Sequence, residues 1–238
     1  MRTILWFLYF WLYLLAVTPA NLYVKHLIKK GNKEEAAPLI QKVVQNWASR
    51  LLAAAGVEVL VEGGENIPSE AALFVCNHQG NFDIPITLSK LGGLKSIVAK
   101  KELAKLPGIR SWMTYFDCIF MDREDPRQSL KSLNQAQELL ERGRSVVIYP
   151  EGTRSKSGKI GEFKPGALRC ALKARAPIVP VAIDGSYRAM EAHGFWIHPA
   201  KVKVTVLPPI HTGEMEKERT KVISDEVRET IAANLSAE

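Results

Sequence analysis

Apolar residues are arranged differently in the first 55 residues than in the remainder of the chain. Between Thr3 and Val17 nearly every residue is apolar. Between Glu34 and Ala55 the apolar residues recur at intervals of three and four, which predicts a helix with one buried face. The intervening turn residues around Gly31 separate the two stretches. We therefore expect a two-helix segment at residues 1–55.

After residue 55, short apolar runs alternate with helical patterns. Strands are expected at residues 57–62, 73–76, 95–100, 118–121, 145–149, 178–183 and 202–206. Helices are expected from residue 84 onward, at 102–106, at 128–142 and from 167 to about 175. Alternating strands and helices predict an α/β domain at residues 56–238, with a mixed, largely parallel sheet flanked by helices.

The run at 73–76 ends abruptly in the polar sequence of residues 77–83, which contains His78 and, five positions later, Asp83. A carboxylate on one imidazole nitrogen fixes the tautomer, so that the other nitrogen can act as a general base. The spacing alone is weak evidence, because a structural histidine beside a helix-capping aspartate gives the same pattern. Residues elsewhere in the chain have to support the interpretation.

Other polar residues also follow apolar runs directly. Lys100, Arg123 and residues 151–154 each come just after an expected strand. Ligands of α/β sheets bind beyond the carboxyl ends of the strands, so we expect these residues to share a cleft with His78. The cations could hold a phosphate by charge-assisted hydrogen bonds, although each taken alone is equally well explained as solvated surface charge.

Charge is unevenly distributed along the chain. The formal net charge is +7, and residues 95–175 contain 17 Lys and Arg against 9 Asp and Glu. This basic region favours an anionic ligand, either a nucleic acid or a lipid that carries phosphate. No nucleic-acid-binding signature is present, so we expect no nucleic acid partner. The three cysteines are far apart and indicate neither a disulfide framework nor a metal site.

The N-terminal apolar stretch indicates membrane attachment. It contains no charged residue between Arg2 and Lys25 and is rich in aromatic residues. It is at the short limit for a span, which needs about 20 apolar residues, and Pro19 makes a poor cleavage site for a signal peptide. A helix lying in one leaflet, held by basic residues, is favoured. A buried core helix is the alternative.

Taken together, these residues resemble the glycerolipid acyltransferases, most closely the bacterial 1-acyl-sn-glycerol-3-phosphate acyltransferases. Residues 77–83 are similar to the Asn-His-x4-Asp motif of the family, and residues 149–155 to its Phe-Pro-Glu-Gly-Thr-Arg-Ser motif, with Tyr149 for Phe. Residues 117–123 resemble Gly-x-x-Phe-Ile-x-Arg, although Asp117 stands in place of glycine. Residues 179–181 resemble the Val-Pro motif. The match extends over about residues 57–210.

The resemblance implies transfer of a fatty acyl group from acyl-CoA or acyl carrier protein to the sn-2 hydroxyl of lysophosphatidate, giving phosphatidate. It implies that His78 is the base and that Asp83 orients it. The remaining motif residues are then expected to bind the substrate phosphate (Glu151, Gly152, Thr153, Arg154, Lys100 and Arg123) or to support the site (Asn77, Phe120 and Pro180). No metal and no cofactor are expected. The expected location is the cytoplasmic face of a bacterial cell membrane, held by the N-terminal helices.

Three alternatives stay open at this point. The acceptor could be glycerol 3-phosphate or a lysophospholipid instead of lysophosphatidate. A non-catalytic module that binds lipid phosphate would use Arg154 and the helices but would not need His78 and Asp83. A thioesterase would use the same base to activate water.

Overall fold

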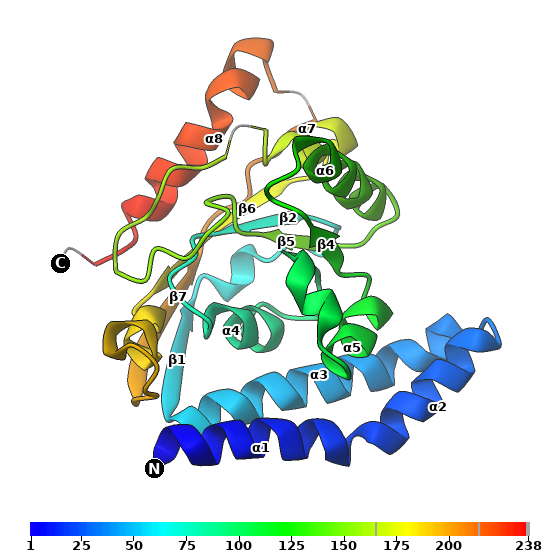
Figure 1. Cartoon of the computed structure of the whole chain (residues 1–238). Helices are drawn as coiled ribbons and strands as arrows, with labels where there is room; N and C mark the ends of the chain where they lie inside the picture. Colours follow the sequence, from blue (N-terminus) through cyan, green and yellow to red (C-terminus); the bar gives the residue numbers. More distant parts are fainter. Residues whose placement is uncertain (165, 214, 237–238) are drawn as a thin grey trace.

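A computed structural model describes residues 1–164, 166–213 and 215–236 (Figure 1). Its strands form one seven-stranded sheet in the order β1-β7-β6-β2-β5-β3-β4. In chain order they are β1 (Val57–Glu62), β2 (Leu73–Cys76), β3 (Ser96–Lys100), β4 (Ile119–Met121), β5 (Val146–Ile148), β6 (Ile178–Asp184) and β7 (Ala200–Val206). The predicted mixed, largely parallel sheet flanked by helices is therefore confirmed.

Eight α-helices lie within the described residues and cover both faces of the sheet. They are α1 (Arg2–Ala16), α2 (Thr18–Lys29), α3 (Lys33–Ala55), α4 (Asp83–Lys90), α5 (Ile109–Tyr115), α6 (Pro126–Glu141), α7 (Arg169–Ala174) and α8 (Lys217–Ala232). In Figure 1, α6, α7 and α8 lie above the sheet, whereas α4, α5 and the three N-terminal helices lie below it.

Strand direction decides which edge of the sheet holds the polar residues. β6, β2, β5, β3 and β4 are mutually parallel, whereas β7 pairs with β6 in the antiparallel direction. Five strands therefore end at the same edge, because the carboxyl ends of parallel strands coincide. The residues that follow those five strands are brought together there.

Side chains of β2 alternate between two hydrophobic clusters. Phe74 and Cys76 belong to the cluster under α3 and α4, and Leu73 and Val75 to the cluster under α6, α7 and α8. Successive side chains of a strand point to opposite faces, so a strand buried on both faces is apolar throughout. This accounts for the unbroken apolar run that precedes the polar sequence.

The N-terminal region contains three helices where the sequence predicted two. Pro19 lies in the first turn of α2, where its missing N–H is tolerated, and α1 and α2 meet at Val17 with a bend of 44°. No single helix among the described residues is long and apolar enough to cross a membrane, whereas α1 and α2 together meet the requirement by length and composition alone.

The helix α3 joins the N-terminal region to the sheet. Its buried residues recur at intervals of three and four and form a single cluster with the lower face of the sheet, in the sequence Ala36, Ile40, Val44, Ala48, Leu51, Leu52 and Ala55. The division at residue 55 stays a prediction, because α3 shares its hydrophobic core with the sheet. Two helices, α5 and α8, were not predicted, and the helix expected at 102–106 is a short 3-10 turn.

Candidate active site

The edge of the sheet described above collects the residues that were predicted to share a site. His78 follows β2, Glu151 follows β5, and Arg123 follows β4. Backbone hydrogen bonds connect two of these segments directly, because Ser155 N donates to His78 O at 2.8 Å and Lys156 N donates to Gln79 O at 3.1 Å. The loop after β5 therefore lies alongside the polar sequence after β2.

His78 and Asp83 form a buried pair. Asp83 is the first residue of α4, and its Oδ2 atom lies 2.6 Å from Nδ1 of His78. The same oxygen accepts hydrogen bonds from the backbone N–H groups of Gln79 and Gly80 at 2.7 and 2.9 Å. A carboxylate facing Nδ1 places the imidazole hydrogen on that atom and leaves Nε2 as the nitrogen that can take a proton.

Ser186 completes the surroundings of Asp83, whose side chain is 0% exposed. The Ser186 hydroxyl donates to Oδ1 of Asp83, so both carboxylate oxygens are bonded. Ser186 follows the end of β6, the fifth of the parallel strands, and the sequence analysis missed it. The rule that selected polar residues at the ends of the other strands would have directed attention to this segment, because Ser186 comes three residues after Ile183, the last residue of a long apolar run.

Tyr149 supports the imidazole from one side. Its ring centroid lies 4.4 Å from that of His78, and its hydroxyl lies 3.1 Å from Oγ1 of Thr87 and donates to the Asp83 carbonyl at 3.3 Å. Burial raises the pKa of the Tyr149 phenol, which therefore stays neutral. An aromatic residue at this position fixes the plane of the imidazole without adding charge.

Asn77 and Gln79 attach the turn to the end of β6. The Asn77 side chain donates to Ile183 O at 2.9 Å and accepts from Ile183 N at 2.7 Å. Oε1 of Gln79 accepts from the backbone N–H groups of Gly185 and Ser186. These bonds continue the pairing of β2 and β6 by side chains, and they hold the residues on both sides of His78.

Glu151 accepts hydrogen bonds from the backbone of the site, a role that the motif alone did not indicate. Its Oε1 accepts from the His78 backbone N–H at 2.6 Å and its Oε2 accepts from Gly161 N at 2.8 Å. Burial raises the pKa of this carboxyl, while the two N–H donors act in the opposite direction. Both oxygens thus hold the backbone of the site, and a contact of Glu151 with phosphate stays a prediction.

The predicted phosphate-binding cations differ in their surroundings. Arg154 pairs with Glu191 at 3.0 Å, and Arg123 donates to the carbonyl of Gly152, whose φ of +71° suits glycine. Lys100 is largely exposed and lies 3.6 Å from Glu102. Arg154 therefore connects the loop after β5 to Glu191, and Arg123 contacts the Gly152 carbonyl of the same loop. Lys100 lies in solvent at the end of β3.

The remaining predicted residues lie in different places. Thr153 is exposed in the loop after β5, and Phe120 is half-buried in β4. Pro180 is buried inside β6, paired with Val75, four residues before the end of the strand. Pro180 therefore belongs to the core of the sheet and does not reach the carboxyl edge.

Glu191 is the second residue that the sequence analysis missed. It lies in a short 3-10 turn, Glu191–His193, and its Oε1 accepts from Asn81 N at 2.8 Å as well as from Arg154. One carboxylate oxygen thus connects the turn that carries His78 to the loop that carries Arg154. No sequence pattern marks Glu191, because its role depends on contacts with residues more than 30 positions away.

Comparison with known proteins identifies the family. A family model described as Acyltransferase matches residues 58–184, more than half of the chain. The chain belongs to the acyltransferase family. This range includes the predicted His78 motif, the loop after β5 and all of β6, which confirms the family predicted from the sequence.

Individual relatives agree with this assignment. A probable 1-acyl-sn-glycerol-3-phosphate acyltransferase of Mycoplasma pneumoniae is 39% identical over 63% of the chain and 58% of its own length. A chloroplastic enzyme of that name from Arabidopsis thaliana is 35% identical over 75% of the chain and 49% of its own length. The match thus spans about half to three fifths of these curated relatives.

A solved structure extends the likeness to nearly the whole chain. The crystal structure of the 1-acyl-sn-glycerophosphate (LPA) acyltransferase PlsC from Thermotoga maritima superposes with a TM-score of 0.76 and 28% identity. The superposition covers 98% of this chain and 97% of the other. The N-terminal helices are therefore part of the shared fold.

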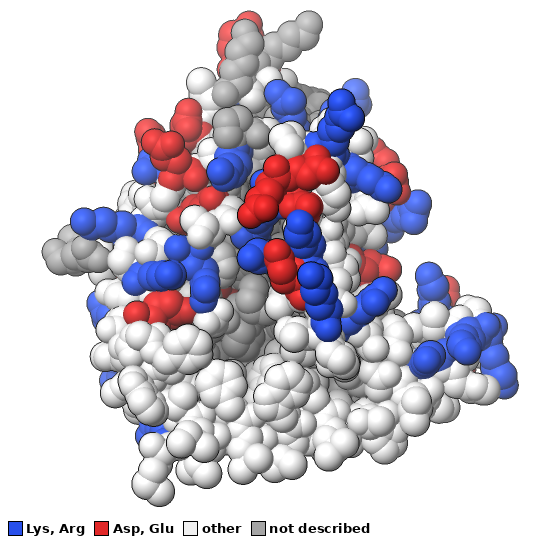
Figure 2. Space-filling view, viewed as in Figure 1, with Lys and Arg blue, Asp and Glu red and all other residues white. Residues whose placement is uncertain are grey.

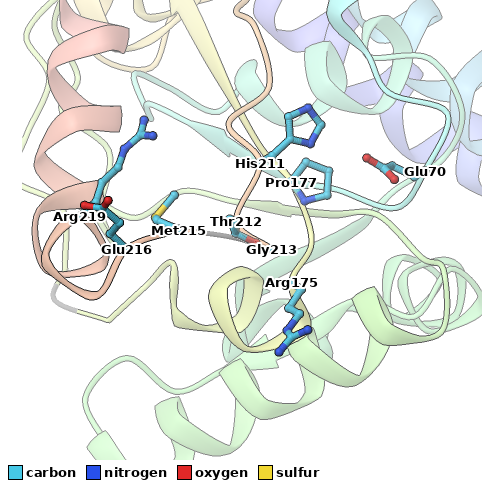
Figure 3. Close-up of a pocket in the computed structure, with 9 residues that line it drawn as sticks. All are labelled: Glu70, Arg175, Pro177, His211, Thr212, Gly213, Met215, Glu216 and Arg219. Atoms are coloured by element: carbon cyan, nitrogen blue, oxygen red, sulfur yellow. The ribbon is translucent and has the colours of Figure 1, made fainter.

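A separate cavity of about 590 Å³ lies at the other edge of the sheet (Figure 3). Glu70 and Pro177 on its rim precede β2 and β6, so it lies at their amino ends, away from His78. Two arginines line it, Arg175 and Arg219, and Arg219 is paired with Glu226. Within the described part of the chain, no group of three or more His, Cys, Asp and Glu is placed to hold a metal ion.

Proposed function

We propose that this chain transfers a fatty acyl group from a thioester of CoA or acyl carrier protein to the sn-2 hydroxyl of 1-acyl-sn-glycerol-3-phosphate, giving phosphatidate. The observation that carries the proposal is the buried His78–Asp83 pair, with Nε2 left to accept a proton, on a turn connected through Glu191 to Arg154. The names of the relatives agree with this substrate.

The chemistry needs only one proton acceptor and positioned substrates. His78 Nε2 takes the proton of the acceptor hydroxyl while the hydroxyl oxygen attacks the thioester carbonyl carbon. The carbon–sulfur bond then breaks, and the departing sulfur takes the proton back from the imidazolium as a thiol. General-base assistance of this kind contributes about 10²- to 10⁴-fold in rate. His78 gains one proton and gives it back, so it ends the reaction in its starting state. Because the acceptor hydroxyl attacks the thioester carbon directly, no acyl-enzyme intermediate is required.

Substrate positioning falls to the basic residues of the edge. Arg154 lies on the loop after β5 and Arg123 donates to the Gly152 carbonyl of that loop, where a phosphate ester could accept charge-assisted hydrogen bonds. Asp83 stabilises the imidazolium that forms during the reaction.

The helix α1 supplies the contact with lipid in this proposal. Six of its large apolar side chains are half or more exposed: Ile4, Leu5, Leu8, Trp11, Leu12 and Leu15. A helix with most of its apolar surface exposed is not a core helix, and an apolar surface of this kind suits the interface of a bilayer. We place the enzyme on the cytoplasmic face of a bacterial membrane, where soluble acyl donors can reach it.

The test is acyl transfer by purified protein in detergent micelles, with radiolabelled acyl-CoA and, separately, labelled acyl carrier protein. His78→Ala is expected to lower phosphatidate formation by 10²-fold or more, with an unchanged melting temperature. His211→Ala is the matched control, because His211 is an exposed histidine on the cavity at the opposite edge. Full activity of His78→Ala would refute the base, and thioester loss without phosphatidate would indicate a thioesterase.

A further inference from the structure

An ordered turn presents two large apolar side chains to solvent. Phe195 is 76% exposed and Trp196 is 58% exposed. The turn is closed by hydrogen bonds from Trp196 N to His193 O at 3.2 Å and from His198 N to Ala189 O at 3.0 Å. The rings of His193 and His198, on either side of the exposed pair in sequence, contact each other with centroids 4.0 Å apart. The exposed pair is therefore held in place by structure and is not a loose loop tip.

The turn is attached to α1. The backbone N–H of Ile197 donates to Oγ1 of Thr3 at 2.9 Å, and this bond is buried. Ile197 itself is buried in the same cluster as Trp6 of α1. In Figure 1 the segment after β6 lies beside the N-terminal end of α1, at the lower left. The turn that carries the exposed Phe195 and Trp196 is therefore joined to the N-terminal end of α1, whose own apolar side chains are also exposed.

The charge around this surface favours lipid over a protein groove. On the face shown in Figure 2, the lower band is almost free of charged side chains, and charged side chains of both signs gather above it. The residues that flank the band in sequence are basic, Arg2, Lys25, Lys29 and Lys30, with no acid among residues 1–30. This apolar surface consists of a helix and a separate turn and is bordered by cations. An anionic bilayer matches it, because the acyl region adapts to an uneven surface and the headgroups attract the cations.

We propose that the Phe195–Trp196 turn is a second membrane-inserting element, which works beside α1 and takes the lipid bilayer as its partner. The proposal deepens the proposed function, on which it rests for the role of α1. The same segment of chain carries Ser186 against Asp83 and Glu191 against Arg154. Insertion of the turn therefore sets the depth and the tilt of the active-site edge relative to the lipid surface. With α1 alone inserted, the protein could still rotate about the axis of α1.

The test compares a double variant with a matched control. Phe195→Ser with Trp196→Ser removes the turn's apolar side chains, whereas Leu130→Ser with Val222→Ser removes two exposed apolar side chains from α6 and α8, on the opposite face. Co-sedimentation with vesicles of phosphatidylcholine and phosphatidylglycerol is measured without substrate. We expect binding of the turn variant to weaken about tenfold or more, and binding of the control to equal that of the wild type.

A second measurement decides the matter if the double variant folds poorly. Vesicles with brominated acyl chains quench tryptophans that enter the acyl region, so Trp196→Phe should remove a quenched component from the wild-type emission. No change in quenching, together with unchanged vesicle binding by the double variant, would overturn the proposal. A loss of oligomer mass in the double variant with no change in quenching would also overturn it, and would assign the turn to contact with a second copy. Binding is measured independently of turnover, so an inactive protein that inserts the turn would refute only the proposed function.

Discussion

Gly80 and Glu191 offer a direct test of how the His78 turn is coupled to Arg154. A Cβ atom at position 80 would lie 2.3 Å from Oε2 of Glu191 and 2.8 Å from its Cδ. The φ of Gly80 is not in the left-handed region, so alanine is strained there only by this contact. To reach an ordinary contact the carboxylate must withdraw by about 1 Å, which breaks the bonds of Oε1 to Asn81 N and to Arg154.

The magnitude follows from the bond to Arg154. A hydrogen bond to a charged group contributes about 1.5–3 kcal/mol. Arg154 is about a third exposed, so we use the lower part of this range. A loss of about 1.5–2 kcal/mol corresponds to a fall of about 10- to 30-fold in kcat/KM for lysophosphatidate. Gly80→Ala should show this fall, with the larger part in KM because Arg154 is proposed to hold the phosphate.

A double-mutant cycle separates the coupling from general damage. Glu191→Ala removes both the carboxylate and the clash, so adding Gly80→Ala to it should cost little more. Gly64→Ala is the control, because a Cβ there would meet no atom within 4 Å and its φ is not positive. The assay is phosphatidate formation in micelles, with melting temperatures measured alongside. Additive losses in the cycle, or full activity of Gly80→Ala, would refute the coupling.

Two further predictions concern buried groups. Ser186→Ala removes a donor from the Asp83 carboxylate, and we expect kcat to fall about tenfold with KM unchanged; a rise in KM at constant kcat, measured over a range of lysophosphatidate concentrations, would contradict this. Burial lowers the pKa of Lys95, which donates to the carbonyls that follow α4, to about 8. Between that value and its ordinary value of about 10.4 the unfolded chain binds a proton that the folded chain has lost, so folding stability should rise with pH in this window, by at most about 1.4 kcal/mol per pH unit. Denaturant titrations of the wild type and Lys95→Met from pH 7 to 10 should show the rise in the wild type alone, and a constant difference between them would exclude it.

The strands of the domain were predictable because their apolar runs are local signals. The strands predicted at 57–62 and 73–76 were confirmed with the same bounds, and the other predicted strands were placed to within a few residues. The helix α8 was missed because most of its residues are polar or charged. Only its few buried apolar residues, such as Val227, mark the face that packs on the sheet. The break at Val17 was missed although Pro19 marks it, because the uncharged stretch between Arg2 and Lys25 was interpreted as part of one helix.

The His78–Asp83 pair was also within reach of the sequence, since both residues lie in one turn. A turn of five residues brings the carboxylate back onto the imidazole without help from distant elements. Asp117 shows the same locality: its φ is +58°, in the left-handed region where the resemblance expects glycine. The substitution of aspartate for glycine is visible in the sequence, and the structure shows that residue 117 keeps the left-handed backbone that glycine favours.

What the sequence determined by itself was the set of strands, the α/β class, the family and the local pair that can move a proton. Only the tertiary structure decided that Ser186 bonds Asp83, that Glu191 connects Asn81 to Arg154, and that Glu151 holds the backbone of His78. The physical reason is range. Hydrophobic periodicity and turn chemistry act between neighbours in sequence. These contacts instead join residues separated by 37 to 110 positions. They form only once the parallel strands have brought their ends to one edge of the sheet.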